Sequence, residues 1–373
     1  MKTLLGLRAT AQSAATVAKM AAKMTRLVGA SALLYGALAS TATIAHAQET
    51  VESLKPSYIA LLLPGNAKAF KPAVDSIRAG VLAAERVYGG ADSPLVRVFD
   101  TTDKEEDIQA QYKKAVEGGA KAVIGPLTKS ALNFLADSTE IKVPVVALNG
   151  FDQTTLPQTK LYSFGLAVEA DAMDTAQQMK LDGLHQVVVL QSADTLGQRL
   201  AQGFASAWEA KNGSSPTIIS IGNAKRDASG LKEQLSQAYA DSVFLAMDAK
   251  NARIIRPFLG NERPVYATSQ IDPGRLGATT MVDLTGVKYL DMPWLANPKQ
   301  EGYELYNRTR SSSNDLERLF ALGVDAWRIA AILINDGTID HLEGLTGILT
   351  MGDNNVISRE MVLRTMGRSA SAP

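Results

Sequence analysis

The 373-residue chain contains no cysteine, and this absence excludes whole classes of site. It removes disulfides, thiolate metal ligands and thiol nucleophiles. It also removes lipid attachment through a cysteine at the processing point, so we expect no lipid anchor. Histidine is scarce as well. Beyond His46 only His185 and His341 occur, and neither has a partner at the spacing that a metal site requires. We expect no metal and no cofactor.

Common enzyme signatures are missing too. The chain has no G-x-S-x-G, G-x-G-x-x-G or G-x-x-x-x-G-K-[ST] motif. The stretch from Ser229 to Lys232 matches S-x-x-K, but neither K-T-G nor S-D-N follows, and the start of a helix explains the serine better. We therefore do not expect an enzyme.

Neither sign of charge is in excess. The 38 basic and 38 acidic residues balance, and no cluster of Lys and Arg stands out. A chain without a basic patch is not expected to bind nucleic acid. Apolar residues make up 46% of the chain, which is typical of a globular protein and not of a disordered one.

Residues 1–47 have the features of a secretory signal peptide. Five basic residues and no acidic one precede Ala47, a short apolar segment begins at Leu27, and Ala45-His46-Ala47 forms an A-x-A cleavage site. The apolar segment carries Gly, Ser and Thr and is short for a membrane span, which needs about 20 mostly apolar residues. We expect cleavage near Ala47 and release into the periplasm; a retained N-terminal anchor is the alternative.

From Tyr58 onward, short apolar or β-branched runs alternate with helical patterns. Strands are predicted at Tyr58–Leu63 and Leu95–Asp100, and a segment with helical periodicity follows each of them. Repeated alternation of this kind predicts an α/β protein with parallel sheets that are covered by helices on both faces. The number of strands favours two doubly wound lobes over one long sheet. We expect residues 55–163 to form lobe 1 and residues 164–286 to form lobe 2.

The last hundred residues break the alternation. Leu316–Leu333 is apolar on nearly every side apart from a strip through Arg318, Asp325 and Arg328, which predicts an interior helix. A hairpin is predicted after it, because two apolar runs flank a Gly-Asp-Asn-Asn turn. We expect residues 287–340 to complete lobe 1, residues 341–366 to complete lobe 2, and residues 367–373 to form a flexible tail.

A binding cleft is expected where the carboxyl ends of the strands meet the amino ends of the helices. Polar side chains follow several predicted strands at these ends. They are our candidates for a small-molecule site: Thr128, Ser130, Asn149, Asp194, Thr195, Asp248, Ser269 and Gln270. Ser, Thr and Asp at such positions are also ordinary helix caps, so capping is the competing interpretation.

A set of segments spread from Tyr58 to Met361 resembles one known family. The segments include "AVIGPLTKSALNFLA", "ARIIRPFL", "DMPWL", "ALGVDAWR" and "GLTGILTM", in this order. They are similar to the penicillin-binding protein activator family (LpoA/LppC). The resemblance implies a fold like that of type 1 periplasmic binding proteins, with two α/β lobes joined by crossing strands. It also implies a regulator that stimulates a class A penicillin-binding protein, the peptidoglycan synthase, by contact and without chemistry of its own.

Two features depart from that family. Its characterised members are outer-membrane lipoproteins, whereas this chain has no cysteine to lipidate, and their N-terminal helical-repeat domain is not found ahead of the α/β pattern. The expected function is therefore that of an untethered periplasmic activator, and the alternative is a solute-binding protein for an amino acid, a peptide or a cell-wall fragment. Trp294 is a candidate partner contact, because Trp is enriched at binding hot spots. A core position is the competing interpretation.

Overall fold

The computed structural model describes residues 57–90, 93–150, 159–212, 214–275, 277–311, 313–352 and 354–367. The signal peptide expected at residues 1–47 lies outside the described residues, as does the expected tail from residue 368 onward. Among the described residues, no helix combines the length and the apolar content that crossing a membrane requires.

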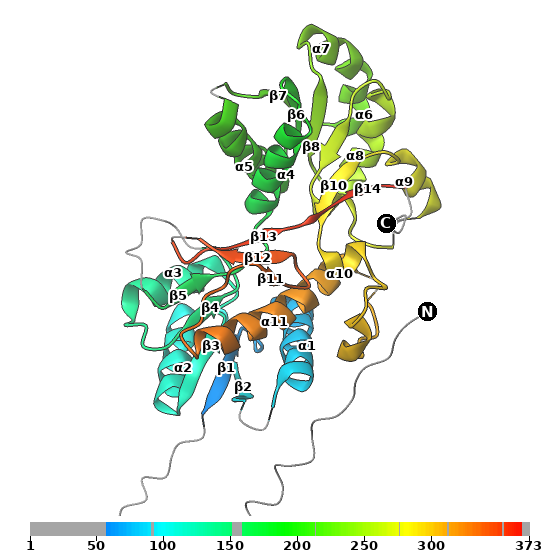
Figure 1. Ribbon diagram of the computed structural model, residues 1–373. Coiled ribbons are helices and arrows are strands. Elements are labelled where there is room, and N and C mark those ends of the chain that lie inside the picture. Colours follow the sequence, from blue (N-terminus) through cyan, green and yellow to red (C-terminus); the bar gives the residue numbers. More distant parts are fainter. Residues whose placement is uncertain are drawn as a thin grey trace, which may run out of the picture. The chain divides into compact units, whose positions relative to one another are not determined.

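A five-stranded parallel sheet forms the core of lobe 1 (Figure 1). Its strands are β1 (Tyr58–Leu63), β2 (Leu95–Asp100), β3 (Ala120–Ile124), β4 (Val145–Ala147) and β5 (Leu161–Ser163). Their order in the sheet is β2-β1-β3-β4-β5, and every pair is parallel. Its two faces are covered by α1 (Lys71–Tyr88) with α11 (Asn314–Leu333), and by α2 (Glu105–Glu117) with α3 (Lys129–Ser138).

The residues of β1 explain why helices cover both faces. Ile59, Leu61 and Leu63 pack with α1 and α11, whereas Tyr58, Ala60 and Leu62 pack with α2 and α3. Successive residues of a strand point to opposite faces, so an unbroken apolar run is buried only when both faces are covered. The prediction of a two-sided parallel sheet is confirmed.

A second sheet forms the core of lobe 2. Its strands are β6 (Val187–Ser192), β7 (Thr217–Ile221), β8 (Ser242–Ala246), β9 (Val265–Ala267), β10 (Lys288–Asp291) and β14 (Val362–Thr365). Their order is β14-β10-β9-β8-β6-β7, and only β14 runs antiparallel to its neighbour. One face packs against α4 (Val168–Leu181) and α5 (Thr195–Asn212). The other packs against α6 (Ala224–Asp227), α7 (Leu231–Gln237), α8 (Ala249–Ile255) and α9 (Ala278–Asp283).

A small antiparallel sheet follows α11 along the chain. It consists of β11 (Leu342–Glu343), β12 (Ile348–Met351) and β13 (Ile357–Glu360). Strands β12 and β13 are the expected hairpin. Leu345, Leu349 and Ile357 pack into the lobe 1 core beside α11. The hairpin is also joined to β5, since the Ser163 backbone N–H donates to the Asn355 carbonyl at 2.9 Å.

The chain passes between the two large sheets three times, after β5, after β10 and after β13. This path corrects the expected division of the last segments. Residues 287–340 are expected in lobe 1, and α10 (Pro293–Ala296), the helical turn Tyr303–Tyr306 and α11 do join the lobe 1 core, but β10 lies inside the lobe 2 sheet. Residues 341–366 were assigned to lobe 2, but β11, β12 and β13 pack on lobe 1 and only β14 enters the lobe 2 sheet. Periodicity reports how deeply a strand is buried but not which sheet it pairs with, which is why the expected division differs from the structure at β10 and at β11 to β13.

Candidate functional site

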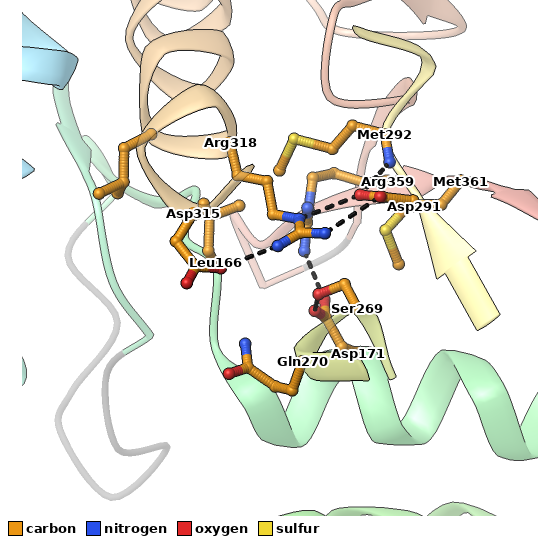
Figure 2. Close-up of a pocket in the computed structure, with 11 residues that line it drawn as sticks. Leu166, Asp171, Ser269, Gln270, Asp291, Met292, Asp315, Arg318, Arg359 and Met361 are labelled. Atoms are coloured by element: carbon orange, nitrogen blue, oxygen red, sulfur yellow. Dashed lines mark hydrogen bonds and ion pairs between the residues drawn. The ribbon is translucent and has the colours of Figure 1, made fainter. Parts of the chain in front are cut away.

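A pocket of about 180 Å³ lies where the three crossing segments come together. Figure 2 shows its lining. Side chains reach it from the start of α4, the first turn of α11, the end of β10, strand β13 and the short helical turn Ser269–Ile271. The charged residues of this lining are Asp171, Asp291, Asp315, Arg318 and Arg359. Both lobes therefore contribute to one polar site.

Arg318 is the central cation of the pocket. Its Nε and Nη2 each lie 3.1 Å from a carboxylate oxygen of Asp291, and its Nη1 donates to Asp315 at 2.8 Å. Only 6% of the Arg318 side chain and none of the Asp291 side chain is exposed. Burial alone would lower the pKa of Arg318, but the attraction of Asp291 raises it above its ordinary value. This arginine stays charged and is held in one orientation.

Two further contacts complete the charge balance around Asp291. Arg364 of β14 donates to Asp291 Oδ2 at 3.2 Å, and the Met292 backbone N–H donates to Asp291 Oδ1 at 2.9 Å. A buried carboxylate is tolerated only when its lone pairs are satisfied in this way. The Asp291 cluster therefore joins α11, β10 and β14 and has no unsatisfied charge for a ligand to neutralise.

A second cluster sits on the other side of the pocket. Arg359 donates to Asp171 Oδ1 at 3.0 Å, and the Ser269 hydroxyl donates to Asp171 Oδ2 at 3.1 Å. Asp174 lies one helical turn from Asp171 on α4. Burial raises the pKa of the Asp174 carboxyl to about 6, with attraction to Arg359 opposing the rise and repulsion from Asp171 adding to it. The Asp174 carboxyl therefore changes its protonation state near pH 6.

The site offers paired charges and hydrogen-bonding groups. No nucleophile paired with a base is found in its lining, and the described residues hold no cluster of three or more His, Asp or Glu that could bind a metal ion. The Ser229 hydroxyl, considered above as part of S-x-x-K, is exposed and donates to the Arg226 carbonyl at 3.4 Å. It lies on the outer helices of lobe 2 and not in this pocket.

Two of the eight cleft candidates, Ser269 and Gln270, line the pocket. Ser269 is buried and bonded to Asp171, while Gln270 is half-buried and takes no part in the ion pairs. Asp248 lines a neighbouring pocket of about 330 Å³, which Gln270 also touches. That Asp248 also caps α8, because its Oδ1 accepts from the Asn251 backbone N–H at 2.9 Å. Ligand binding by these residues stays a prediction.

The other five candidates line neither pocket. Asp194 caps α5 by accepting from the Gly197 backbone N–H at 2.8 Å, and Thr195 is the exposed first residue of that helix. Asn149 donates to the Leu127 carbonyl at 2.9 Å and so links the end of β4 to the loop after β3. Thr128 and Ser130 flank the start of α3, where the Thr128 side chain makes no capping hydrogen bond. Helix capping accounts for Asp194, and a hydrogen bond between two loops accounts for Asn149 in this structure.

The charged residues that dominate the site were not singled out from the sequence. Arg318 was read only as part of a polar strip on an interior helix, and Asp291 and Arg359 were not considered. A signal was available, because an ionised side chain within an apolar helix or at the end of a buried strand must find a partner. The sequence does not say which partner, since the paired residues lie 27 positions apart for Arg318 and Asp291 and 188 apart for Arg359 and Asp171.

Trp294, the candidate partner contact, is only 2% exposed. Its indole N–H donates to the buried Glu317 carboxylate at 2.9 Å, and its ring centroid lies 4.9 Å from that of Tyr303 and 5.5 Å from that of Phe320. The backbone N–H of Trp294 donates to the Leu345 carbonyl at 3.1 Å. Trp294 is therefore a core residue of lobe 1, and partner contact at this position can act only through the residues around it.

Comparison with known proteins adds a family to this geometry. A family model described as "LppC putative lipoprotein" matches residues 40–229 and 222–366. A curated relative from Glaesserella parasuis serovar 5, named penicillin-binding protein activator LpoA, is 30% identical over 312 residues. That match covers 81% of this chain and 52% of the relative, so the chain spans about half the length of the relative.

Solved structures share the fold. A protein from Chromobacterium violaceum described as a "putative branched-chain amino acid ABC transporter" is 32% identical, with a TM-score of 0.72, and the match covers 83% of this chain and all of that one. The LpoA C-domain from Haemophilus influenzae, described as a regulator of PBP1A, is 23% identical with a TM-score of 0.71, covering 84% of this chain and 98% of the domain. The second likeness shows the fold alone. The prediction of a fold like that of type 1 periplasmic binding proteins is confirmed.

Proposed function

This chain belongs to the LppC family, and from that premise we propose that it is a non-enzymatic periplasmic regulator that activates a class A penicillin-binding protein by direct contact. The observation that carries the proposal is the family match, which runs through nearly all of the described residues. The names of the relatives support it, because they are called penicillin-binding protein activators. The pocket at the crossing segments is consistent with it, since its charged groups neutralise one another and none is left for catalysis.

Activation by contact has an energetic requirement. The regulator must bind the active conformation of the synthase more tightly than the inactive one, because equal affinity for both shifts no population. A tenfold shift towards the active conformation requires a preference of about 1.4 kcal/mol. A few well-placed interface contacts supply that much, so the regulator needs no chemistry of its own.

The test is a binding and activity measurement with the purified synthase. A class A penicillin-binding protein encoded by the same genome should be captured by this protein, and its glycan polymerisation or peptide cross-linking should rise when the protein is added. Absence of both capture and stimulation would overturn the proposal. N-terminal sequencing of the exported protein checks the accompanying proposal that cleavage near Ala47 releases it into the periplasm.

A second candidate function is binding of a small solute such as an amino acid, a peptide or a cell-wall fragment. It is favoured by the 32% identity to the Chromobacterium protein over that protein's whole length. The ion pairs inside the pocket weigh against it, because a charged ligand would have to displace them. Thermal unfolding with a panel of these solutes separates the two functions. A ligand present at 100 times its dissociation constant should stabilise the protein by about 2.7 kcal/mol.

A further inference from the structure

A separate pocket of about 380 Å³ lies on lobe 1 in the segment that joins α10 to α11. Its lining is rich in hydrogen-bond donors, and we name it the loop pocket. The donors are Lys299, Gln300, Tyr303, Asn307, Arg308 and Arg310. Glu304 is the one acidic side chain in the described lining, so cations outnumber anions there.

The loop pocket is built on a buried anchor. The Glu317 side chain, 1% exposed, accepts from Arg308 Nη2 at 3.1 Å and from the Trp294 indole N–H at 2.9 Å. It also accepts from the Ser311 backbone N–H at 2.6 Å. These bonds tie both ends of the loop to α11, so its surface is presented by an ordered frame and not by a loose connection.

Two buried donors in this frame have no acceptor among the described residues. The Tyr303 hydroxyl is buried without a hydrogen-bond partner, and so is Arg308 Nε. Burial raises the pKa of Tyr303 to about 12, so the hydroxyl keeps its proton at neutral pH and can donate. A buried polar group left without a partner is uncommon and calls for an explanation.

Two cations of the lining, Arg310 and Lys299, are exposed and can contact an anion of a partner. Arg310 donates to the Trp294 carbonyl at 3.0 Å and lies over the Trp294 ring, with its guanidinium carbon 4.6 Å from the ring centroid. Neither Arg310 nor Lys299 forms an ion pair with any residue that the structure describes, and both are exposed. The guanidinium is thus oriented by the indole, while its charge remains unneutralised.

An exposed apolar residue follows the lining of the loop pocket in the chain. Leu305, next to Glu304 on the short helical turn Tyr303–Tyr306, is 63% exposed. Tyr88 at the end of α1 is 44% exposed, and its hydroxyl lies 2.7 Å from that of Tyr306 on the same helical turn. Arginine and tyrosine beside exposed leucine is a composition typical of protein interfaces.

We propose that the loop pocket is a docking site for an acidic segment of a partner protein, with a partner carboxylate received by the exposed Arg310 and Lys299. The proposal rests on the proposed function, which makes that partner the class A synthase. The excess of cations in the lining favours a carboxylate, and the exposed Leu305 favours a polypeptide over a small anion.

The experiment compares matched variants of the full chain for binding to the purified synthase. The double variant Lys299→Gln with Arg310→Gln removes two charges from the loop pocket. Its control, Lys225→Gln with Lys232→Gln, removes two exposed charges from the outer helices of lobe 2. We expect the first to weaken binding by about tenfold or more, at low salt above all, and the control to bind within about twofold of the wild type.

Tyr303→Phe is a control for the interior of this frame. Removing an unpartnered hydroxyl that has no exposed surface should leave the midpoint of thermal unfolding unchanged or raise it, and binding of the synthase should stay within about twofold of the wild type. Sodium glutamate added as a competitor should not displace the synthase at millimolar concentration; displacement would identify a small-anion site and overturn the docking proposal.

The outcomes separate this inference from the proposed function. If wild-type protein binds and stimulates the synthase while the double variant does so equally well, the docking site is wrong and the proposed function stands. If the wild type does not bind the synthase at all, both are overturned.

Discussion

The guanidinium of Arg318 holds the carboxylate of Asp291 through two nitrogens, Nε and Nη2, each 3.1 Å from an oxygen. Arg318 belongs to α11, which packs on lobe 1, and Asp291 ends β10, which lies in the lobe 2 sheet. One buried ion pair therefore connects the two folding cores. The pair is tolerated in the interior only while both partners are present, because the cost of removing two charges from water is offset by their attraction to each other.

Replacing Arg318 by Met should lower the free energy of unfolding by about 3–5 kcal/mol, since Asp291 would stay buried with Arg364 as its only remaining cation among the described residues. Urea denaturation monitored by tryptophan fluorescence measures the change. The matched control is Lys71→Met, which breaks the exposed pair with Asp75 on α1 and should cost less than about 1 kcal/mol. Equal effects for the two variants would show that the Arg318 pair contributes no more than a surface pair.

Replacing Trp294 by Ala should destabilise lobe 1 by about 3–5 kcal/mol, because the ring is buried against Tyr303 and Phe320. Trp294→Phe should cost less, about 1–3 kcal/mol, since it keeps most of the packing and loses the N–H bonded to Glu317. Both values come from chemical denaturation. Wild-type stability in Trp294→Ala, combined with lost synthase binding, would instead make Trp294 a direct partner contact.

Replacing Gly80 by Ala should destabilise the packing of α1 against α11. A Cβ at Gly80 would overlap the Phe320 carbonyl oxygen, and one at Gly323 would overlap the Ile77 carbonyl oxygen. Alanine would gain about 0.5–1 kcal/mol in helix propensity. Backbone overlap should exceed that gain, so we expect a net loss of about 1–3 kcal/mol, seen as a lower midpoint of thermal unfolding.

Gly90→Ala is the control for this helix contact. Its Cβ would meet nothing nearer than the Ser93 hydroxyl at 3.9 Å, so the change should stay within about 0.5 kcal/mol. A stabilised Gly80→Ala variant would mean that the two helices can move apart without cost.

The Asp174 carboxyl should give the protein a pH dependence near the pocket. Its pKa in the folded state is raised to about 6, chiefly by burial, above the ordinary value of 3.8. A raised pKa means that the protonated form is favoured by folding. The contribution of the protonated Asp174 carboxyl to the free energy of unfolding is therefore fully present below about pH 4 and is lost as the pH rises through 6.

Asp174→Asn should remove this dependence. Relative to the wild type, the variant should gain about 1–2 kcal/mol in free energy of unfolding between pH 4 and pH 7, because the amide never has to ionise. Denaturation curves at a series of pH values measure the difference. A difference that is constant across this range, or that shrinks towards pH 7, would contradict the raised pKa.

The alternation of apolar runs and helical patterns was enough to predict an α/β fold with two-sided parallel sheets. The reason is local: "YIALLL" can be satisfied only by burial on both faces, and the fold around β1 follows from that. The apolar character of Leu316–Leu333 likewise predicted an interior helix, and α11 is one. The hairpin of β12 and β13 was predicted because its two strands are neighbours in the chain.

Much less of the candidate site could be predicted from the sequence. Of the eight cleft candidates, Ser269 and Gln270 line the pocket at the crossing segments and Asp248 lines its neighbour. Residues at the ends of strands have the same composition whether they cap a helix or face a ligand, so the sequence alone could not separate Asp194 from Ser269. The ion-pair partners of Arg318 and Arg359 could not be predicted for another reason. An ion pair requires two groups to be close in space, whatever their separation in the chain.

What the sequence determined by itself was the character of each segment: buried strand, amphipathic helix, interior helix or turn. Such character arises from neighbouring residues and from the periods of strand and helix. Only the tertiary structure decided which lobe each late strand joins and which charged residues pair. It places β10 and β14 in the lobe 2 sheet, β11 to β13 on lobe 1, and Asp291 beside Arg318. These pairings are selected by the combined burial of many distant segments, and no local pattern carries that information.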